Sequence, residues 1–192
     1  MTTLLVEQTA SPPTDELQLA REAVTNVDAF AELYRRHATR VYRYHMAHTG
    51  NAKDSEDLTS QTFMAALEGI RSFRGSGSFA AWIMGIASRK RLMHVRGSRP
   101  EVALDAALQY PSPGLGTDKA ALQRLELESV ARALQQISSD RAEAIILTYF
   151  GGLSNLETSR VLNKSEAAVK MLVSRGLQDL RERTSLALEV EL

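Results

Sequence analysis

A stretch rich in proline and glycine, residues 100–117, interrupts this chain of 192 residues near its middle. Such a stretch favours neither a helix nor a strand. On both sides of it, apolar residues recur every three or four positions, the period of an amphipathic helix. A chain of this length buries one medium core or two small ones, and the interruption favours two. We therefore predict an all-α fold of two helical modules joined by a flexible linker.

Composition sets the predicted boundaries. Residues 1–27 are polar and acidic and contain two adjacent prolines, which predicts a disordered leader. The first module covers 28–99, the linker 100–117 and the second module 118–185. Residues 186–192 form a short acidic and apolar tail, and the sequence does not decide whether it frays or packs on a partner.

Charge is distributed unevenly along the chain. The formal net charge is zero, but residues 30–99 hold 12 basic and 5 acidic residues. Within them, residues 71–99 carry seven Lys or Arg residues, no Asp or Glu, and the aromatic residues Phe73, Phe79 and Trp82. Basic residues with interleaved aromatic rings are typical of surfaces that bind nucleic acid.

The first module contains three predicted helices. Helical periodicity runs from Asp28 to a stop at Gly50-Asn51, and a second helix over 54–70 opens with three acidic residues that suit the positive end of a helix dipole. Glycines and serines predict a loop over 74–78. The third helix is predicted over 79–95, with Trp82 as a core anchor and with further buried residues Ile83, Ile86, Ala87, Leu92 and Val95.

The second module begins with two predicted helices, over 118–136 and 140–150. Ser154 and Glu157 then form a capping box that opens a short helix. The turn after that helix contains Asn163, at a position that often needs a left-handed backbone.

A longer amphipathic helix follows over 166–183, with Ser165 as its N-cap. A short helix, a tight turn and a longer helix are typical of a helix-turn-helix that reads a DNA major groove. An ordinary helical hairpin has the same pattern.

The sequence offers little for enzyme chemistry. Gly75-Ser76-Gly77 lacks the preceding strand of a phosphate-binding loop, and no nucleophile motif is present. The four histidines, His37, His45, His48 and His94, have no cysteine beside them, so we expect neither a metal site nor a cofactor. Residues 1–16 have neither the basic segment nor the apolar segment of a signal peptide, and the sequence has no unbroken apolar run of membrane-spanning length. We therefore expect a cytoplasmic protein without membrane insertion.

Four stretches resemble, in order and spacing, the successive regions of bacterial sigma factors of the extracytoplasmic-function (ECF) group, the minimal two-domain members of the primary sigma family. They are FAELYRRHATRVYRY, DSEDLTSQTFMAAL, FRGSGSFAAWIMGIA and GLSNLETSRVLNKSEAAVKMLVSRGLQDLRER. The resemblance implies that 28–99 is sigma region 2 and 118–185 is sigma region 4. It also implies a factor that binds core RNA polymerase and promoter DNA and opens the DNA at the minus-ten element.

Site residues follow from the same resemblance. The helix over 54–70 matches the one that docks on the clamp helices of core polymerase, and the residues that form or support this surface are Asp57, Gln61, Thr62, Phe63 and Leu67. The loop and third helix match the part that captures nontemplate-strand bases at the minus-ten element, with contact positions Phe73, Arg74, Ser76, Ser78, Phe79, Arg89, Lys90, Arg91, His94 and Arg96. The positions that match contacts to the minus-thirty-five element are Ser165, Glu166, Ala168, Lys170, Ser174 and Arg175.

The chain departs from the family pattern at a few positions. Asn is common where Arg89 stands and Asp where Met93 stands, and Met171-Leu172 replace a typical Ser-Arg pair. Losing that Arg predicts weaker DNA binding with a smaller salt dependence.

The resemblance also implies a regulatory partner, and the sequence leaves one alternative function open. ECF factors are commonly held inactive by an anti-sigma protein wedged between the modules, and the linker would permit that here. The alternative function is a helix-turn-helix regulator that acts without core polymerase. The basic aromatic stretch over 71–99 argues against it, because a sensing or dimerisation domain has no need of such a stretch.

Overall fold

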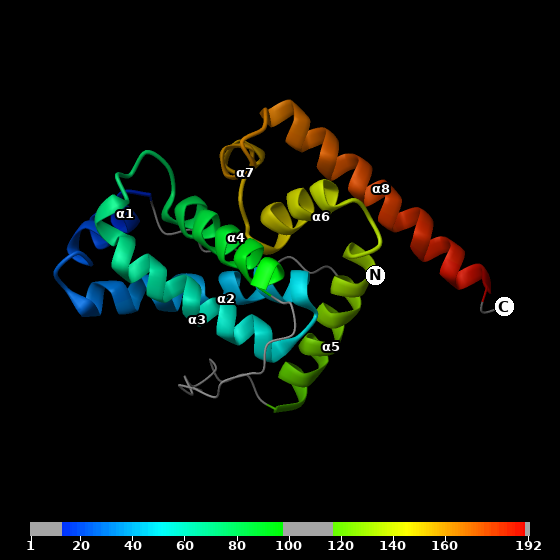
Figure 1. Cartoon of the computed structure of the whole chain (residues 1–192), viewed down its shortest axis with the longest axis horizontal. Coiled ribbons are helices and arrows are strands. Elements are labelled where there is room, and N and C mark those ends of the chain that lie inside the picture. Colours follow the sequence, from blue (N-terminus) through cyan, green and yellow to red (C-terminus); the bar gives the residue numbers. More distant parts are fainter. Residues whose placement is uncertain (1–12, 98–116, 191–192) are drawn as a thin grey trace.

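The computed structural model describes residues 13–97 and 117–190, and the regular structure of these residues is helical throughout (Figure 1). The first module contains α1 (Pro13–Glu22), α2 (Val27–Thr49), α3 (Ala52–Gly69), a 3-10 turn (Ile70–Ser72) and α4 (Phe79–Gly97). The second contains α5 (Thr117–Leu134), α6 (Ser139–Ile145), a π-helical turn (Ile146–Phe150), α7 (Asn155–Leu162) and α8 (Glu166–Val190). The predicted all-α fold of two helical modules is confirmed, and the linker falls almost wholly outside the described residues.

The boundary between α2 and α3 is set by local chemistry. Gly50 ends α2 in the left-handed conformation, with φ at 62°. The Asn51 side chain then caps α3 by accepting a hydrogen bond from the backbone N–H of Asp54, at 3.1 Å. The predicted stop at Gly50-Asn51 is confirmed. The helix ends here because glycine tolerates the left-handed conformation and the asparagine side chain accepts a hydrogen bond from a free N–H group of the next helix.

Helix α1 shows that the prediction of a disordered leader over 1–27 is wrong for its second half. Asp15 Oδ2 lies 2.9 Å from Arg36 Nη1, and Glu16 Oε1 lies 2.8 Å from His37 Nε2. Ala20 and Ala23 are buried in the same contact. The acidic composition of this segment predicts that it is solvated. Its partners Arg36 and His37 lie 21 positions away in the sequence, so the local composition does not reveal these contacts.

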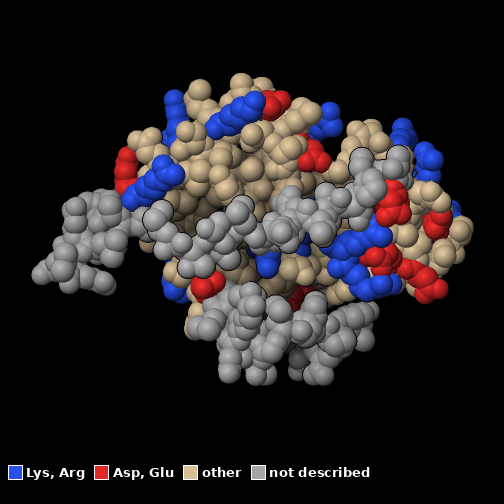
Figure 2. All heavy atoms as spheres, turned by 180° about the vertical axis from the view of Figure 1, so that it is seen from behind, with Lys and Arg blue, Asp and Glu red and all other residues tan. Residues whose placement is uncertain are grey.

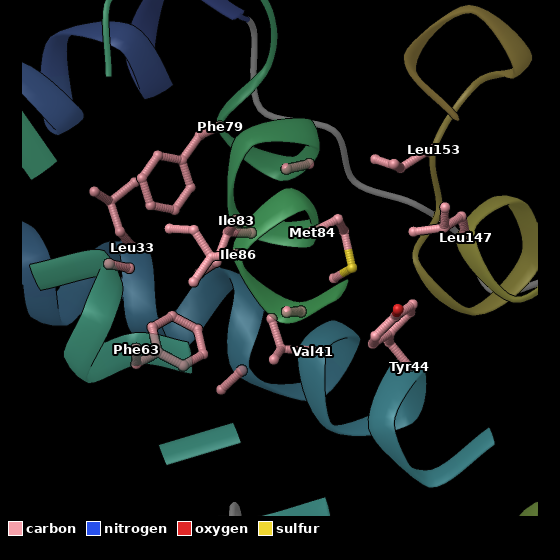
Figure 3. Packing of buried hydrophobic residues seen from close by; sticks show 14 of the residues in the cluster. Leu33, Val41, Tyr44, Phe63, Phe79, Ile83, Met84, Ile86, Leu147 and Leu153 are labelled. Carbon is pink, nitrogen blue, oxygen red and sulfur yellow. The ribbon is translucent and has the colours of Figure 1, made fainter. Parts of the chain in front are cut away.

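Most of the buried apolar side chains form one continuous cluster with members from both modules, and not the two separate cores that we predicted. Figure 3 shows Tyr44 and Met84 of the first module facing Leu147 of the second. All three have an exposed fraction of 0%. Burying a side chain of this size contributes about 1.5–3 kcal/mol to stability, so the contact between the modules is part of the core.

Helix α4 is buried mainly in its first half. Ile83, Ile86 and Ala87 are buried as predicted, whereas Trp82 is only half-buried. Leu92 and Val95, which we predicted to be buried, are exposed by 43% and 63%. Apolar periodicity indicates which face of a helix is apolar, but it does not indicate how far along the helix another element covers that face.

The second module has the predicted helix-turn-helix. In the capping box of α7, Ser154 Oγ accepts a hydrogen bond from the Glu157 N–H at 3.2 Å, and Glu157 Oε2 accepts one from the Ser154 N–H at 2.9 Å. Asn163 is left-handed in the turn, with φ at 52°. The helix predicted over 140–150 divides into α6 and the π-helical turn, and α8 continues beyond the predicted end at Arg183.

Candidate nucleic-acid interface

Helix α3 presents a mixed polar and apolar face to solvent. Asp57 and Gln61 are exposed, and Met64 and Leu67 continue the same face with exposed fractions of 60% and 47%. Positions three or four apart lie together on a helix, so these side chains form one strip. We call these four residues the α3 strip.

Two of the predicted docking residues lie beneath this strip and support it. Thr62 is fully buried, donates a hydrogen bond to the Leu58 carbonyl at 2.7 Å, and lies 3.1 Å from Nε2 of His45. Phe63 is buried and packs edge-on against Phe30 and Tyr34. Both therefore hold α3 on α2 and do not reach the surface.

The loop before α4 is anchored by three aromatic rings. The ring centroids of Phe73, Phe79 and Trp82 lie 5.3–5.5 Å from one another. Phe79 is exposed by only 1%, so in this conformation the ring belongs to the core, and its contact with DNA stays a prediction. Arg74 and Ser76 project from the loop as exposed residues.

Helix α4 and the end of α3 enclose a small open hollow of about 230 Å³. Its lining includes the half-buried Trp82, the cations Arg89 and Lys90, and Met93. An aromatic wall beside cations suits stacking of a base with contacts to the flanking phosphates. The sequence assigns Trp82 to the core alone, because its apolar spacing gives no sign that the side chain is only half-buried.

The recognition helix α8 is held by a few apolar side chains. Val169 is fully buried, and Ser165 Oγ accepts a hydrogen bond from the Ala168 N–H at 3.1 Å, which caps the helix. Lys170, Ser174 and Arg175 are exposed, while Ala168 is half-buried. Glu166 Oε1 lies 2.8 Å from Lys170 Nζ, so these two predicted DNA contacts pair with each other here.

No single charge dominates the surface that Figure 2 shows. Basic side chains lie there in several separate groups, with acidic side chains beside some of them. This agrees with a formal net charge of zero. Strong nonspecific binding to nucleic acid needs a continuous basic surface, so we expect contacts at defined positions instead.

Residues 13–97 and 117–190 contain neither of two other kinds of site. No three His, Asp or Glu side chains there are placed to hold a metal ion together. No helix in this part of the chain combines the length and apolar character needed to cross a bilayer.

Comparison with known proteins assigns the chain to a family. Residues 33–101 match the family model of sigma-70 region 2, and residues 127–180 match that of sigma-70 region 4. The chain is 32% identical over 163 residues to the ECF RNA polymerase sigma factor BldN of Streptomyces coelicolor, which covers 83% of this chain and 62% of BldN. The chain belongs to the ECF group of the sigma-70 family.

A second ECF relative and a solved structure are also similar to the chain. The chain is 24% identical over 166 residues to the ECF sigma factor SigW of Bacillus subtilis, covering 81% of this chain and 89% of SigW. The structure of CnrH in complex with the cytosolic domain of CnrY has a TM-score of 0.68 and 26% identity, and it covers 89% of this chain and 97% of CnrH. The chain spans less than two thirds of the length of BldN.

Regions 2 and 4 of this ECF chain meet at a buried carboxylate, Glu143 of α6, which is exposed by 7%. Tyr44 donates a hydrogen bond from Oη to Glu143 Oε1 at 2.7 Å. Arg91 Nη2 lies 2.8 Å and His48 Nε2 lies 3.2 Å from Oε2 of the same carboxylate. We call these four residues the Glu143 cluster. Arg91, a predicted DNA contact, therefore faces region 4 and not solvent.

Burial and the neighbouring side chains shift the pKa of the Glu143 carboxyl in opposite directions. Burial opposes ionisation of Glu143, but the His48 ring and the Arg91 guanidinium outweigh it and lower the pKa of the carboxyl to about 2. Burial also lowers the pKa of the neighbouring His48 and raises the pKa of Tyr44. Sequence analysis missed Glu143, for which the only signal was one acidic residue within an apolar helix.

A second contact joins the two regions at the other end of α4. Ser78 Oγ donates a hydrogen bond to Glu157 Oε1 in α7, and the same hydroxyl accepts one from the Ala81 N–H at 3.1 Å. Ser78 thus caps α4 and also contacts region 4. Of the predicted minus-ten residues, Arg89 and Lys90 lie beside Trp82 at the hollow, whereas Ser78 and Arg91 contact region 4.

Proposed function

We propose that this chain binds core RNA polymerase and directs promoter-specific transcription initiation, opening the DNA at the minus-ten element. The proposal is supported by one observation above all: regions 2 and 4 of the sigma family occur in order in one chain, over residues 33–101 and 127–180. In this proposal the chain works in the cytoplasm and catalyses nothing itself. It supplies binding energy that places polymerase and separates the DNA strands.

We assign polymerase docking to the α3 strip. A strip with two polar and two exposed apolar side chains has the mixed character of a protein interface, and the aliphatic residues give it apolar area to bury. Thr62 and Phe63 keep this helix in register with α2. The proposed domain for these contacts is residues 28–99.

The docking assignment predicts the effect of a double variant. Asp57→Ala with Gln61→Ala should weaken binding to core polymerase by about tenfold, since interface side chains that matter contribute about 1 kcal/mol or more each. The matched control is Glu126→Ala with Gln136→Ala, which removes a carboxylate and an amide from two exposed positions, one on α5 and one in the turn after it. Affinity is measured with labelled chain and purified core enzyme. Equal affinity of both double variants and the unaltered chain would remove these residues from the docking surface.

We assign capture of the melted strand to the hollow beside α4. Trp82 gives a ring for stacking, Arg89 and Lys90 give charge for phosphates, and Arg74 and Ser76 are exposed in the adjacent loop. Separating a base from its neighbours costs a few kcal/mol, and stacking on an aromatic ring returns about 1–3 kcal/mol. His94 and Arg96 lie further along α4 and extend the proposed phosphate track.

We assign the minus-thirty-five contact to α8, within the proposed domain 118–185. Its exposed Lys170, Ser174 and Arg175 are free to face a major groove, and Ser165 positions the start of the helix. Because Lys170 already pairs with Glu166, part of its charge is neutralised before DNA arrives. Region 4 should therefore bind DNA weakly alone and rely on polymerase to hold both regions at one promoter.

We also propose a regulatory partner of the anti-sigma kind. The sigma factor RpoE, whose structure covers 80% of this chain with a TM-score of 0.56, was solved in complex with the anti-sigma factor NepR from Bartonella quintana.

The test of the function is run-off transcription of genomic fragments with bacterial core polymerase. We expect a distinct set of fragments to yield transcripts only when the chain is added. The opposite result is that the chain shifts the same fragments without core enzyme and starts no transcript. That outcome would favour the helix-turn-helix regulator.

A further inference from the structure

Helix α1 touches the loop over 74–78, to which we assign part of the capture of the melted strand. Gly75 in this loop is left-handed, with φ at 70°. A Cβ atom at Gly75 would lie 2.4 Å from Cδ1 of Leu17 and 3.3 Å from its Cδ2. These distances leave no room for a side chain, so the end of the Leu17 side chain lies directly against the backbone of Gly75. The loop therefore rests on α1.

The two ends of the loop are fixed by aromatic packing. Phe73 precedes the loop and Phe79 follows it, and their ring centroids lie 5.5 Å apart. Between them, Arg74, Ser76 and Gly77 are exposed. The side chain from α1 adds a contact within the first module between these two fixed ends.

Helix α1 is itself firmly attached to the first module. Glu16 Oε1 lies 2.8 Å from Nε2 of His37, whose side chain is almost completely buried. The His37 ring in turn lies 5.1 Å from the ring of Phe79, measured between centroids. Ala20 and Ala23 are buried in the core. The helix therefore forms a fixed support for the loop.

The support matters because of what the loop presents. Arg74 and Ser76 lie on either side of Gly75, and both are exposed. A loop of glycines and serines has many accessible backbone conformations, and fixing one of them costs entropy. A loop that is held in one conformation before DNA arrives loses less entropy on binding than a mobile loop.

We propose that Leu17 is a positioning residue for capture of the melted strand, and that α1 is therefore part of the minus-ten site. The proposal rests on the proposed function, because the position of the loop matters only if the loop meets DNA. It also extends the site beyond the match to sigma-70 region 2, which begins at residue 33.

The first test measures the mobility of the loop in the free, full-length chain. The chain contains no cysteine, so a nitroxide spin label can be attached at Ser76→Cys alone. Leu17→Ala should make the label more mobile and narrow its resonance lines, because the side chain under Gly75 is gone. The matched control is Leu19→Ala. Leu19 is also a half-buried leucine of α1, but residues two positions apart lie on different sides of a helix, so this variant should leave the line shape unchanged.

The second test measures promoter opening by the chain with core polymerase, on a fragment selected by run-off transcription. Leu17→Ala should lower the ratio of open to closed promoter by about tenfold, which is the entropic cost of ordering roughly one residue. Its affinity for core enzyme should not change, whereas a general loss of folding would lower both. Leu17→Met keeps the size of the side chain and should restore opening. Leu19→Ala should open the promoter as the unaltered chain does.

Gly75→Ala disturbs the same contact from the side of the loop, so it provides a second variant if Leu17→Ala does not fold. Its added methyl group would collide with Leu17, and alanine disfavours a positive φ. It should also lower the ratio of open to closed promoter without changing the affinity for core enzyme. In urea unfolding, Gly75→Ala should lower the midpoint less when Leu17→Ala is present, because the shorter side chain leaves room for the methyl group.

Each outcome decides the proposal. A more mobile loop and poorer opening at normal core affinity support it. Label mobility and opening in Leu17→Ala that equal those of Leu19→Ala overturn it, as does a loss of opening that only follows a loss of core affinity. If the unaltered chain opens no promoter, the proposed function fails. Loop mobility and the unfolding midpoints, which need neither DNA nor polymerase, then still decide whether Leu17 positions the loop.

Discussion

Gly176 allows α8 to approach α6 closely, and replacing it tests the placement of the recognition helix. A Cβ atom at position 176 would lie 2.7 Å from Cδ1 of Ile145 and 3.1 Å from Cβ of Arg141. Ile145 is exposed by only 3% and cannot turn into solvent, and the Arg141 Cβ is fixed to the backbone of α6. The Gly176→Ala variant therefore has to move α8 outward or distort α6.

The expected magnitude is the sum of two opposing effects. Alanine stabilises a helix interior by about 1 kcal/mol relative to glycine. Overpacking a well-filled core costs about 1–3 kcal/mol. We expect the overpacking to prevail, so that Gly176→Ala lowers the free energy of unfolding by about 1 kcal/mol. The helix that carries Lys170 and Arg175 should be displaced at the same time.

Gly85 provides the matched control in the same protein. It lies inside α4, and a Cβ atom there would meet no heavy atom of another part of the chain within 4 Å. Gly85→Ala should therefore raise the free energy of unfolding by up to about 1 kcal/mol. Urea unfolding followed by circular dichroism measures both variants. Equal stabilisation by the two substitutions would refute the close contact between α6 and α8.

Two further predictions concern stability. Burial lowers the pKa of His45 from its ordinary value of 6.5 to about 3, so the folded chain binds fewer protons than the unfolded chain between these values, and stability falls as the pH falls. Urea unfolding should show a loss of about 1 kcal/mol from this residue between about pH 7.5 and pH 5.5, and His45→Gln should reduce that loss. An unchanged pH dependence in the variant would contradict the assignment. Asn163 is left-handed, so Asn163→Ala should lower stability by about 1 kcal/mol and Asn163→Gly should not; equal effects in thermal unfolding would show that the turn is not strained.

Sequence reasoning succeeded where structure depends on neighbours in the chain. The capping box at Ser154 and Glu157, the left-handed Asn163 and the stop at Gly50-Asn51 are each decided by a few adjacent residues. Chemistry at this range is visible in a single sequence.

It failed where a residue's surroundings come from a distant part of the chain. Glu143 meets Tyr44 across 99 positions, and Ser78 meets Glu157 across 79, so no local pattern predicts either contact. Phe79 lies in a stretch whose charge pointed to nucleic acid, but the ring turns into the core. Leu92 shows the reverse error, because its apolar spacing continues along α4 after the covering elements end.

The predicted site residues show the same difference between local and distant determinants. Asp57, Gln61 and Leu67 form an exposed strip because helical spacing alone sets their common face. Whether Arg91 faces DNA or protein depends on the position of region 4. The spacing of residues along α4 does not predict that position.

The central claim is that this chain opens promoter DNA only together with polymerase. The direct measurement is permanganate reactivity of thymines around the start site of a fragment selected by run-off transcription. With chain and core enzyme together, we expect thymines of the minus-ten element to become reactive, and with either component alone we expect them to stay protected. Reactivity with core enzyme alone, or protection when both are present and bound, would contradict the account.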